Sequence, residues 1–187
     1  MIGASARGPA ARLAPGGVLE RLAHLAPCPV AVAPDGYWGN PRQHLQRIGV
    51  AYLPTPDGRR ALAVAVPLAR SAGARLRLLE AVPRGSAALP ARLAAEADLT
   101  AAADGLGDGA IERRMLTGAP ADALRRAAEK LDLLVCGSHA RGPLGGLLWP
   151  SVSARVARDA SCPVLIVPPG ADPWEPAPLV RSAPDAR

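Results

Sequence analysis

The sequence contains no phenylalanine and only five tyrosine and tryptophan residues in 187, or 3% aromatic residues. Long apolar runs are also missing: runs such as LDLLVC and VLIV fall far short of the ~20 residues that a membrane span needs. The start of the chain, MIGASARGPAARLAPGG, has no apolar core of the kind found in a signal peptide. These absences predict a cytoplasmic protein with no membrane partner.

Cysteine and histidine are scarce, with three residues of each type. Cys28, Cys136 and Cys162 form no CxxC pair and no cluster with histidine at zinc-ligand spacing, so no metal site is predicted. We expect each thiol to be reduced and buried. His24 and His44 have no ligand partner at metal spacing, and we expect both side chains to be exposed.

Lysine is almost absent, because only Lys130 accompanies the arginines among 22 basic residues. The formal net charge is +6. A nucleic-acid surface needs clustered basic residues with aromatic side chains among them, and the arginines here are scattered along the sequence. The abundance of Arg, Ala, Gly and Pro indicates a GC-rich coding sequence, so codon bias accounts for the positive net charge. Together with the scattered arginines, this disfavours nucleic acid as a partner.

The chain repeats itself. Residues 3–34 and 137–168 align without a gap at an offset of 134, with 14 identities in 32 positions and the motif Cys-Pro-Val in both. The first copy has nothing before it that matches the region before the second, which suggests a truncated domain or a misplaced start codon. This predicts a remnant of a first domain at 1–34, a linker at 35–46, a complete domain at 47–168 and a disordered tail at 169–187.

The complete copy alternates short apolar runs with helical patterns. The expected strands are 47–52, 76–82, 111–116, 133–136 and 164–167, and the expected helices are 59–73, 87–103, 118–130 and 151–160. Pro67 falls inside the first helix, where it costs ~3 kcal/mol or kinks the helix. The order predicts an α/β fold: a five-stranded parallel sheet of Rossmann type with helices on both faces, plus the loop–helix–strand remnant at the N-terminus.

Ligands of such sheets bind beyond the carboxyl ends of the strands. This places a candidate site at the loop after the first strand, 53–58, and at the Gly/Pro-rich loop 137–150. Ser151 begins the helix that follows, where free N–H groups favour an anion.

The segments IGVAYLPTPDGRRAL, LTGAPADAL and LDLLVCGSHARGPLGGLLWPSVSARVARDASCPVLIVP resemble the universal stress protein family over about residues 47–168. Residues 3–34 resemble the last loop, helix and strand of the same family, as in its tandem form. The resemblance implies an adenine nucleotide alpha hydrolase-like fold, with Rossmann-type topology, and a protein that takes part in the stress response.

Family members that bind ATP carry Gly-x2-Gly-x9-Gly-Ser/Thr after the fourth strand and an Asp after the first. Gly137 and the hydroxyl of Ser151 are kept here, but Ala140 and Pro150 replace the second and third glycines, and Leu53 replaces the Asp. We therefore expect no cofactor and no enzymatic activity. The alternative is a nucleotide-binding regulator with at most slow hydrolysis, which uses the residues of the loop: Gly137, Ser138, Arg141, Gly142 and Ser151.

In the family, last strands pair edge to edge across two domains. The resemblance therefore implies self-association, either within the chain or as a homodimer. The pairing strands are then Val30, Ala31 and Val32 against Val164, Leu165, Ile166 and Val167.

His139, beside Ser138, suggests a catalytic dyad of a nucleophile and a base. The side chains of adjacent residues rarely point toward each other, however, and no acid that could orient the histidine is near in sequence. We expect His139 to face solvent.

Overall fold

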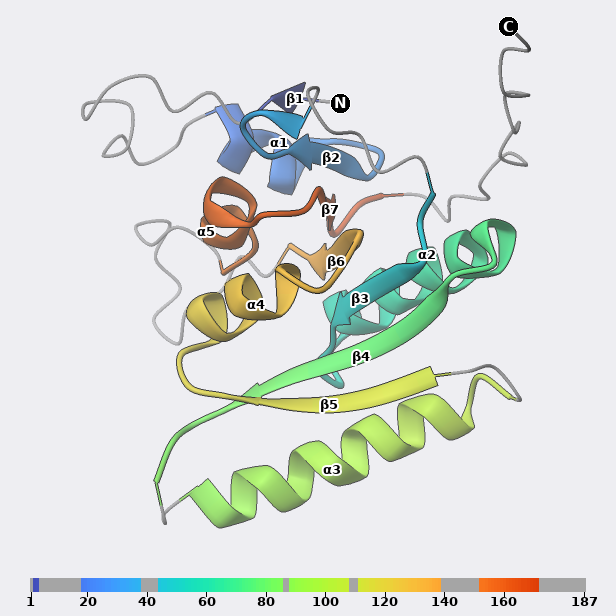
Figure 1. The fold of residues 1–187 in the computed structure, drawn as a ribbon, viewed down its shortest axis with the longest axis vertical. Coiled ribbons are helices and arrows are strands. Elements are labelled where there is room, and N and C mark those ends of the chain that lie inside the picture. Colours follow the sequence, from blue (N-terminus) through green and yellow to red (C-terminus); the bar gives the residue numbers. More distant parts are fainter. Residues whose placement is uncertain are drawn as a thin grey trace, which may run out of the picture.

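A computed structural model of the chain describes residues 2–3, 18–37, 44–85, 88–107, 111–138 and 152–171. These ranges hold seven strands and five helices, coloured along the chain in Figure 1. The strands are β1 (Ile2–Gly3), β2 (Val30–Ala33), β3 (Arg47–Ala51), β4 (Arg75–Val82), β5 (Ile111–Thr117), β6 (Leu133–Gly137) and β7 (Val164–Val167). The helices are α1 (Val18–Leu25), α2 (Pro56–Ala72), α3 (Leu89–Asp104), α4 (Pro120–Ala128) and α5 (Val152–Asp159).

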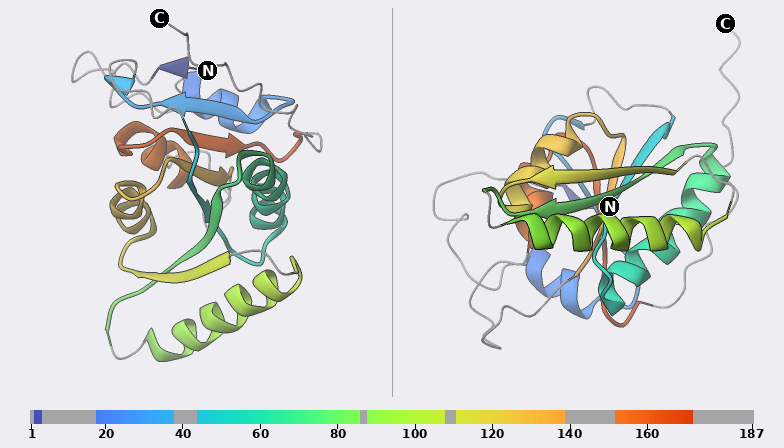
Figure 2. Two further views of the ribbon diagram at one scale, coloured as in Figure 1. Left: turned by 45° about the vertical axis from the view of Figure 1, so that its right-hand side comes forward. Right: turned by 90° about the horizontal axis from the view of Figure 1, so that it is seen from below.

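All seven strands form one sheet in the order β1-β2-β7-β6-β3-β4-β5. The five strands of the complete copy are parallel to one another, as predicted. The connections β3-α2-β4-α3-β5 run toward one edge, and β5 then crosses back through α4 to β6, beside β3. Because right-handed crossovers in opposite directions put their helices on opposite faces, the sheet is covered on both sides (Figure 2).

Two apolar cores lie on the two faces of the sheet. On one face, α2 and α3 bury Ala61, Leu68 and Leu99 against β3 and β4. On the other face, α1, α4 and α5 pack their apolar sides on β6, β7 and β2, and they share a single core. The helices of the N-terminal copy and of the complete copy therefore stabilise each other.

Helix α2 begins and ends at recognisable signals. The hydroxyl of Thr55 accepts a hydrogen bond from the N–H of Gly58 at 3.2 Å, which caps the first turn. Gly73 ends the helix with φ 64°, a left-handed conformation that glycine adopts without steric cost. The helix continues through Pro67. Val64 and Leu68, on either side of this proline, are buried.

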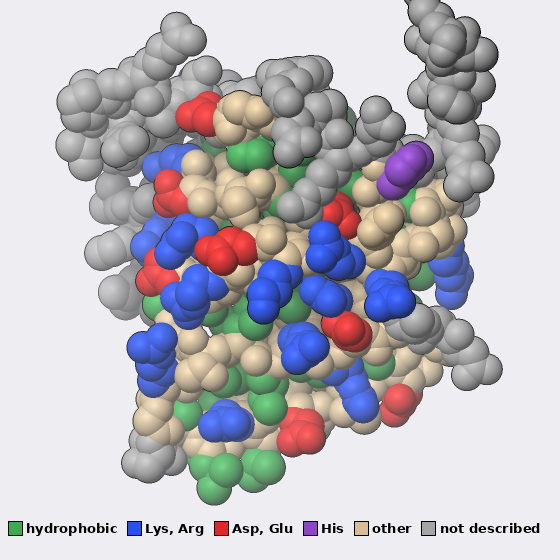
Figure 3. Space-filling view, viewed as in Figure 1, with side chains coloured by type: hydrophobic (Ala, Val, Ile, Leu, Met, Phe, Trp, Pro, Cys, Tyr) green, Lys and Arg blue, Asp and Glu red, His purple; other side chains and the backbone are tan. Residues whose placement is uncertain are grey.

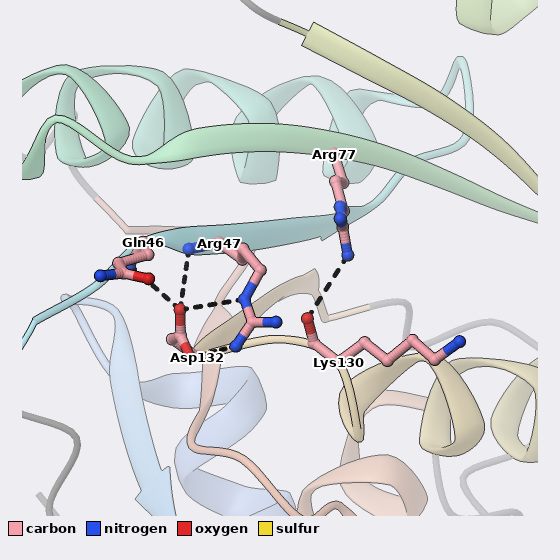
Figure 4. A network of polar contacts seen from close by, with 5 residues as sticks. All are labelled: Gln46, Arg47, Arg77, Lys130 and Asp132. Carbon is pink, nitrogen blue, oxygen red and sulfur yellow. Dashed lines mark hydrogen bonds and ion pairs between the residues drawn. The ribbon is translucent and has the colours of Figure 1, made fainter.

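The amino ends of the central strands are joined by a buried carboxylate (Figure 4). Asp132 accepts hydrogen bonds from the backbone N–H groups of Gln46 at 3.0 Å and Arg47 at 2.9 Å. Its second oxygen pairs with the guanidinium of Arg47 at 3.2 Å, and the Asp132 side chain is only 3% exposed. This carboxylate therefore fixes where β3 begins relative to the turn before β6.

The N-terminal copy repeats the geometry of the complete copy. Helix α1 and strand β2 begin and end 134 residues before α5 and β7. The parallel pairing of Ile2 with Val32 has its counterpart, at the same offset, in the pairing of Cys136 with Ile166. The offset found in the sequence is thus also the offset of the elements and of their register.

Candidate functional site

The carboxyl ends of β3 and β6 bring the two predicted loops together. These neighbouring strands lead to opposite sides of the sheet, which makes this the topological switch point. Gly137, at the end of β6, lies against the first turn of α2: a Cβ there would be 2.6 Å from the carbonyl oxygen of Asp57. The backbone of α2 therefore fills the space beside Gly137 and explains why this position has no side chain.

The loop after β3 is packed as tightly. Gly58 is buried beneath Leu53, and a Cβ at Gly58 would overlap the carbonyl oxygen of Leu53. Leu53 itself is 46% exposed and presents an apolar side chain to solvent. The carboxylate of Asp57, the residue before Gly58 in the first turn of α2, pairs with the guanidinium of Arg60 at 2.7 Å. The described part of this loop thus offers an apolar group where the family's ATP-binding pattern has an acid.

Ser138 is fully buried and engaged. Its N–H donates to the carbonyl of Val167 at 2.9 Å, and its hydroxyl is hydrogen-bonded to Nδ1 of His24 at 2.6 Å. The expectation that His24 is simply exposed is wrong, because its side chain is part-buried in this contact. His24, in the N-terminal copy, thus forms a hydrogen bond with the hydroxyl of Ser138, a predicted nucleotide-binding residue. His44 is exposed, as expected.

The other predicted members of this site lie outside the described residues. They are the loop positions His139, Ala140, Arg141 and Gly142 and the two positions before α5, Pro150 and Ser151. The same holds for half of the predicted linker, at 38–43, and for the predicted tail beyond residue 171.

A buried acidic group beside the switch point was not predicted from the sequence. Glu80 of β4 is 7% exposed, and its Oε2 has no hydrogen-bond partner among the described residues. Burial, and then the nearby Asp98 of α3, raise the pKa of Glu80 to about 7. Burial also raises the pKa of Tyr52, with further contributions from Asp98 and Glu80 that Arg59 opposes. Sequence reasoning missed Glu80 because the same strand also carries Arg75 and Arg77, so one more charged residue in it does not indicate a buried group.

Two of the three cysteines are buried, as expected, and Cys28 is exposed, contrary to expectation. Cys28 lies in the turn between α1 and β2, whereas its counterpart Cys162 packs in the core beneath α5. Burial, and then the neighbouring Cys162, raise the pKa of the Cys136 thiol to about 12. Cys136 is therefore a thiol, not a thiolate, at neutral pH.

The described ranges contain no group of three or more His, Cys, Asp or Glu side chains placed to hold a metal ion. Over the same ranges, no helix has both the length and the apolar character to cross a membrane.

The predicted pairing strands lie side by side. Strand β2 is antiparallel to β7, with Val30 opposite Ile166, Ala31 opposite Leu165 and Val32 opposite Val164. Val30 and Val164 are equivalent positions of the two copies, and so are Val32 and Ile166, so the pairing is reciprocal about Ala31 and Leu165. This is the geometry of a two-fold interface contained within one chain.

The architecture defines a Rossmann-like α/β protein with its candidate site at the switch point. Residues 44–168 match the model of the Universal stress protein family. A universal stress protein of Thermus aquaticus, encoded in the QAH/OAS sulfhydrylase 3' region, is 36% identical over 130 residues, which cover 63% of this chain and 95% of that protein. The chain therefore belongs to the universal stress protein family.

Solved structures agree. A universal stress protein crystallised in complex with cAMP has a TM-score of 0.56 and 31% identity, over 66% of this chain and 97% of that one. A universal stress protein from Archaeoglobus fulgidus has a TM-score of 0.58 and 23% identity, over 80% of this chain and 53% of that one. The second comparison concerns the fold alone, and this chain spans about half of that relative.

Proposed function

We propose that this chain is a non-enzymatic stress-response protein of the tandem type, with a truncated first copy, and that it acts in the cytoplasm through sheet-edge pairing or partner binding. The observation that carries the proposal is the reciprocal pairing of β2 with β7. Apolar residues of the first copy, Ala23, Val30 and Val32, are buried in one core with α5 and β7. The first copy therefore serves the complete domain as a pairing partner.

The proposal that the ATP motif is degenerate is supported by the described half of the site. Gly137 is packed on the backbone of Asp57, the hydroxyl of Ser138 is bonded to His24, and Leu53 supplies no polar atom from its side chain.

Deleting residues 1–34 tests the pairing. The shortened chain keeps all of residues 44–168 but loses the strand that covers β7, so two copies are expected to pair through β7, with Leu165 opposite Leu165. Light scattering should give twice the mass of one shortened chain, whereas the full chain should have the mass of one chain.

Leu165→Lys in the shortened chain is the matched control. Two lysines would then face each other at the centre of the new interface, and the mass should return to that of one chain. Equal association of the full and shortened chains would contradict the proposal that the first copy is the pairing partner.

The alternative function is a nucleotide-binding regulator with at most slow hydrolysis, and a relative of 31% identity has been solved in complex with cAMP. Titration calorimetry with Mg-ATP and, separately, with cAMP distinguishes it. We expect no heat of binding from either nucleotide. A dissociation constant tighter than about 100 µM, near −5.5 kcal/mol, would establish the alternative. Loss of that affinity in Ser138→Ala would assign it to this site.

A further inference from the structure

The far end of the sheet carries a groove that the proposed pairing does not use. It has a volume of about 590 Å³ and lies between helix α4 and the strands β4 and β5. Its floor and walls include the apolar side chains Leu79, Leu116, Ala123, Ala127 and Leu131. In this region the sheet face extends beyond the helix that covers it (Figure 1).

The rim of the groove is basic. Arg77, Arg114, Arg126 and Lys130 line it, and none of the lining residues is acidic. Figure 3 shows Lys and Arg side chains gathered across the middle of this face. Residues scattered along the sequence are collected here because β4 and β5 pair in register and α4 crosses beside them.

Hydrogen bonds to backbone carbonyls hold two of these side chains in place. Arg126 Nη2 donates to the carbonyl of Thr117 at 3.2 Å, and Arg77 Nη1 donates to the carbonyl of Lys130 at 3.4 Å (Figure 4). Arg77 also pairs with Glu112 at 2.6 Å, whereas Arg114 is 3.9 Å from the same carboxylate and its side chain is 65% exposed. One carboxylate thus faces several cations, which leaves the groove positive.

The groove borders an open strand edge. Strand β5 is the last strand of the sheet, and among the described residues it pairs only with β4. Its residues Arg113, Arg114 and Met115 are exposed. An edge strand offers unpaired N–H and C=O groups to an incoming strand, and arginines on it repel a second copy of the same edge.

We infer that this groove binds an extended acidic segment of a partner protein, which adds a strand to β5. Main-chain hydrogen bonds to the edge would give affinity, and alternate side chains of the segment would enter the groove. The apolar floor suits small aliphatic side chains, and the rim suits carboxylates. Nucleic acid is the less favoured polyanion, because no aromatic side chain lines the groove for base stacking.

The inference is independent of the proposed pairing, because β5 and β2 lie on opposite sides of the central strands β6 and β3. The full chain is titrated into a fluorescein-labelled peptide that matches β5 in length and alternates Glu and Val. Binding is measured by anisotropy. A peptide of the same length that alternates Lys and Val, and a single-stranded oligonucleotide of equal charge, are titrated in parallel.

The Glu-Val peptide is expected to bind, and Arg114→Glu and Arg126→Glu should each weaken it by roughly tenfold. Arg92→Glu, a charge reversal on the exposed side of α3, is the matched control and should leave the affinity unchanged. Hydrogen exchange should slow at the amides of Ile111–Thr117 when the peptide is bound. The inference is overturned by absence of binding, by equal or tighter binding of the oligonucleotide, or by unprotected β5 amides.

Discussion

Replacing Asp132 by alanine should lower the free energy of unfolding by about 3 kcal/mol and the melting temperature by roughly 10 °C. The carboxylate accepts two backbone N–H groups, from Gln46 and Arg47, and pairs with the Arg47 guanidinium. Alanine leaves both donors and the cation without their partner at the start of β3. The loss of the acceptor for two backbone N–H groups accounts for most of this cost, because the Arg47 side chain is 39% exposed and water can hydrate it. Thermal and denaturant unfolding measure the loss.

Two further variants separate the contributions at this position. Asp132→Asn keeps an oxygen acceptor but removes the charge, so its loss should fall between those of the wild-type and alanine proteins. Asp104→Ala, at the exposed end of α3, is the matched control and should change stability by less than ~0.5 kcal/mol. If Asp132→Ala lowers the free energy of unfolding no more than Asp104→Ala does, the hydrogen bonds and the ion pair of Asp132 do not stabilise the fold.

Replacing Glu80 by glutamine should remove a pH dependence of stability. The pKa of Glu80 rises from 4.5 to about 7 in the fold, chiefly through burial and then through Asp98. The folded state therefore binds the proton more tightly than the unfolded state. That contribution is complete below pH 4.5 and is lost as the pH rises through about 7.

Between pH 5 and pH 8 the free energy of unfolding of the wild-type protein should accordingly fall by on the order of 2 kcal/mol, whereas that of the variant should not. Glutamine resembles the protonated acid, so both proteins should be similarly stable at pH 5 and the variant more stable at pH 8. Urea unfolding at both pH values measures the difference. Glu96→Gln, on the exposed side of α3, is the control. Parallel pH profiles for the wild-type and Glu80→Gln proteins would rule out this role.

The alternation of strands and helices was predictable because burial on both faces leaves continuous apolar runs in the strands. Strand β7 occupies the predicted residues, and the others differ by a residue or two at their ends. The start of α2 was placed too late, because Pro56 and the Thr55 cap are local signals that a helical pattern of apolar residues does not show. Helix α2 continues through Pro67 although proline disfavours a helix interior, and the buried Val64 and Leu68 beside it supply tertiary packing that the local preference does not include.

The candidate site was predictable only in part. The position of Gly137 after a buried strand was visible, but its reason, the close approach of the Asp57 backbone, depends on a segment 80 residues earlier. The contact between His24 and Ser138 spans 114 residues, and no spacing in the sequence indicates it. The basic groove needs the register of β4 with β5, which scattered arginines do not reveal. Exposure of Cys28 likewise follows from how α1 meets β2.

The antiparallel contact between β2 and β7 has a consequence for how the molecule responds to its own abundance. The two strands belong to one chain, so their encounter is governed by an effective concentration that a short tether sets in the millimolar range. An interface between separate copies of a protein is half-formed only near its dissociation constant and weakens on dilution. Here the occupancy of the β7 edge is the same whether the cell holds few copies or many, and only chain cleavage or local unfolding can change it.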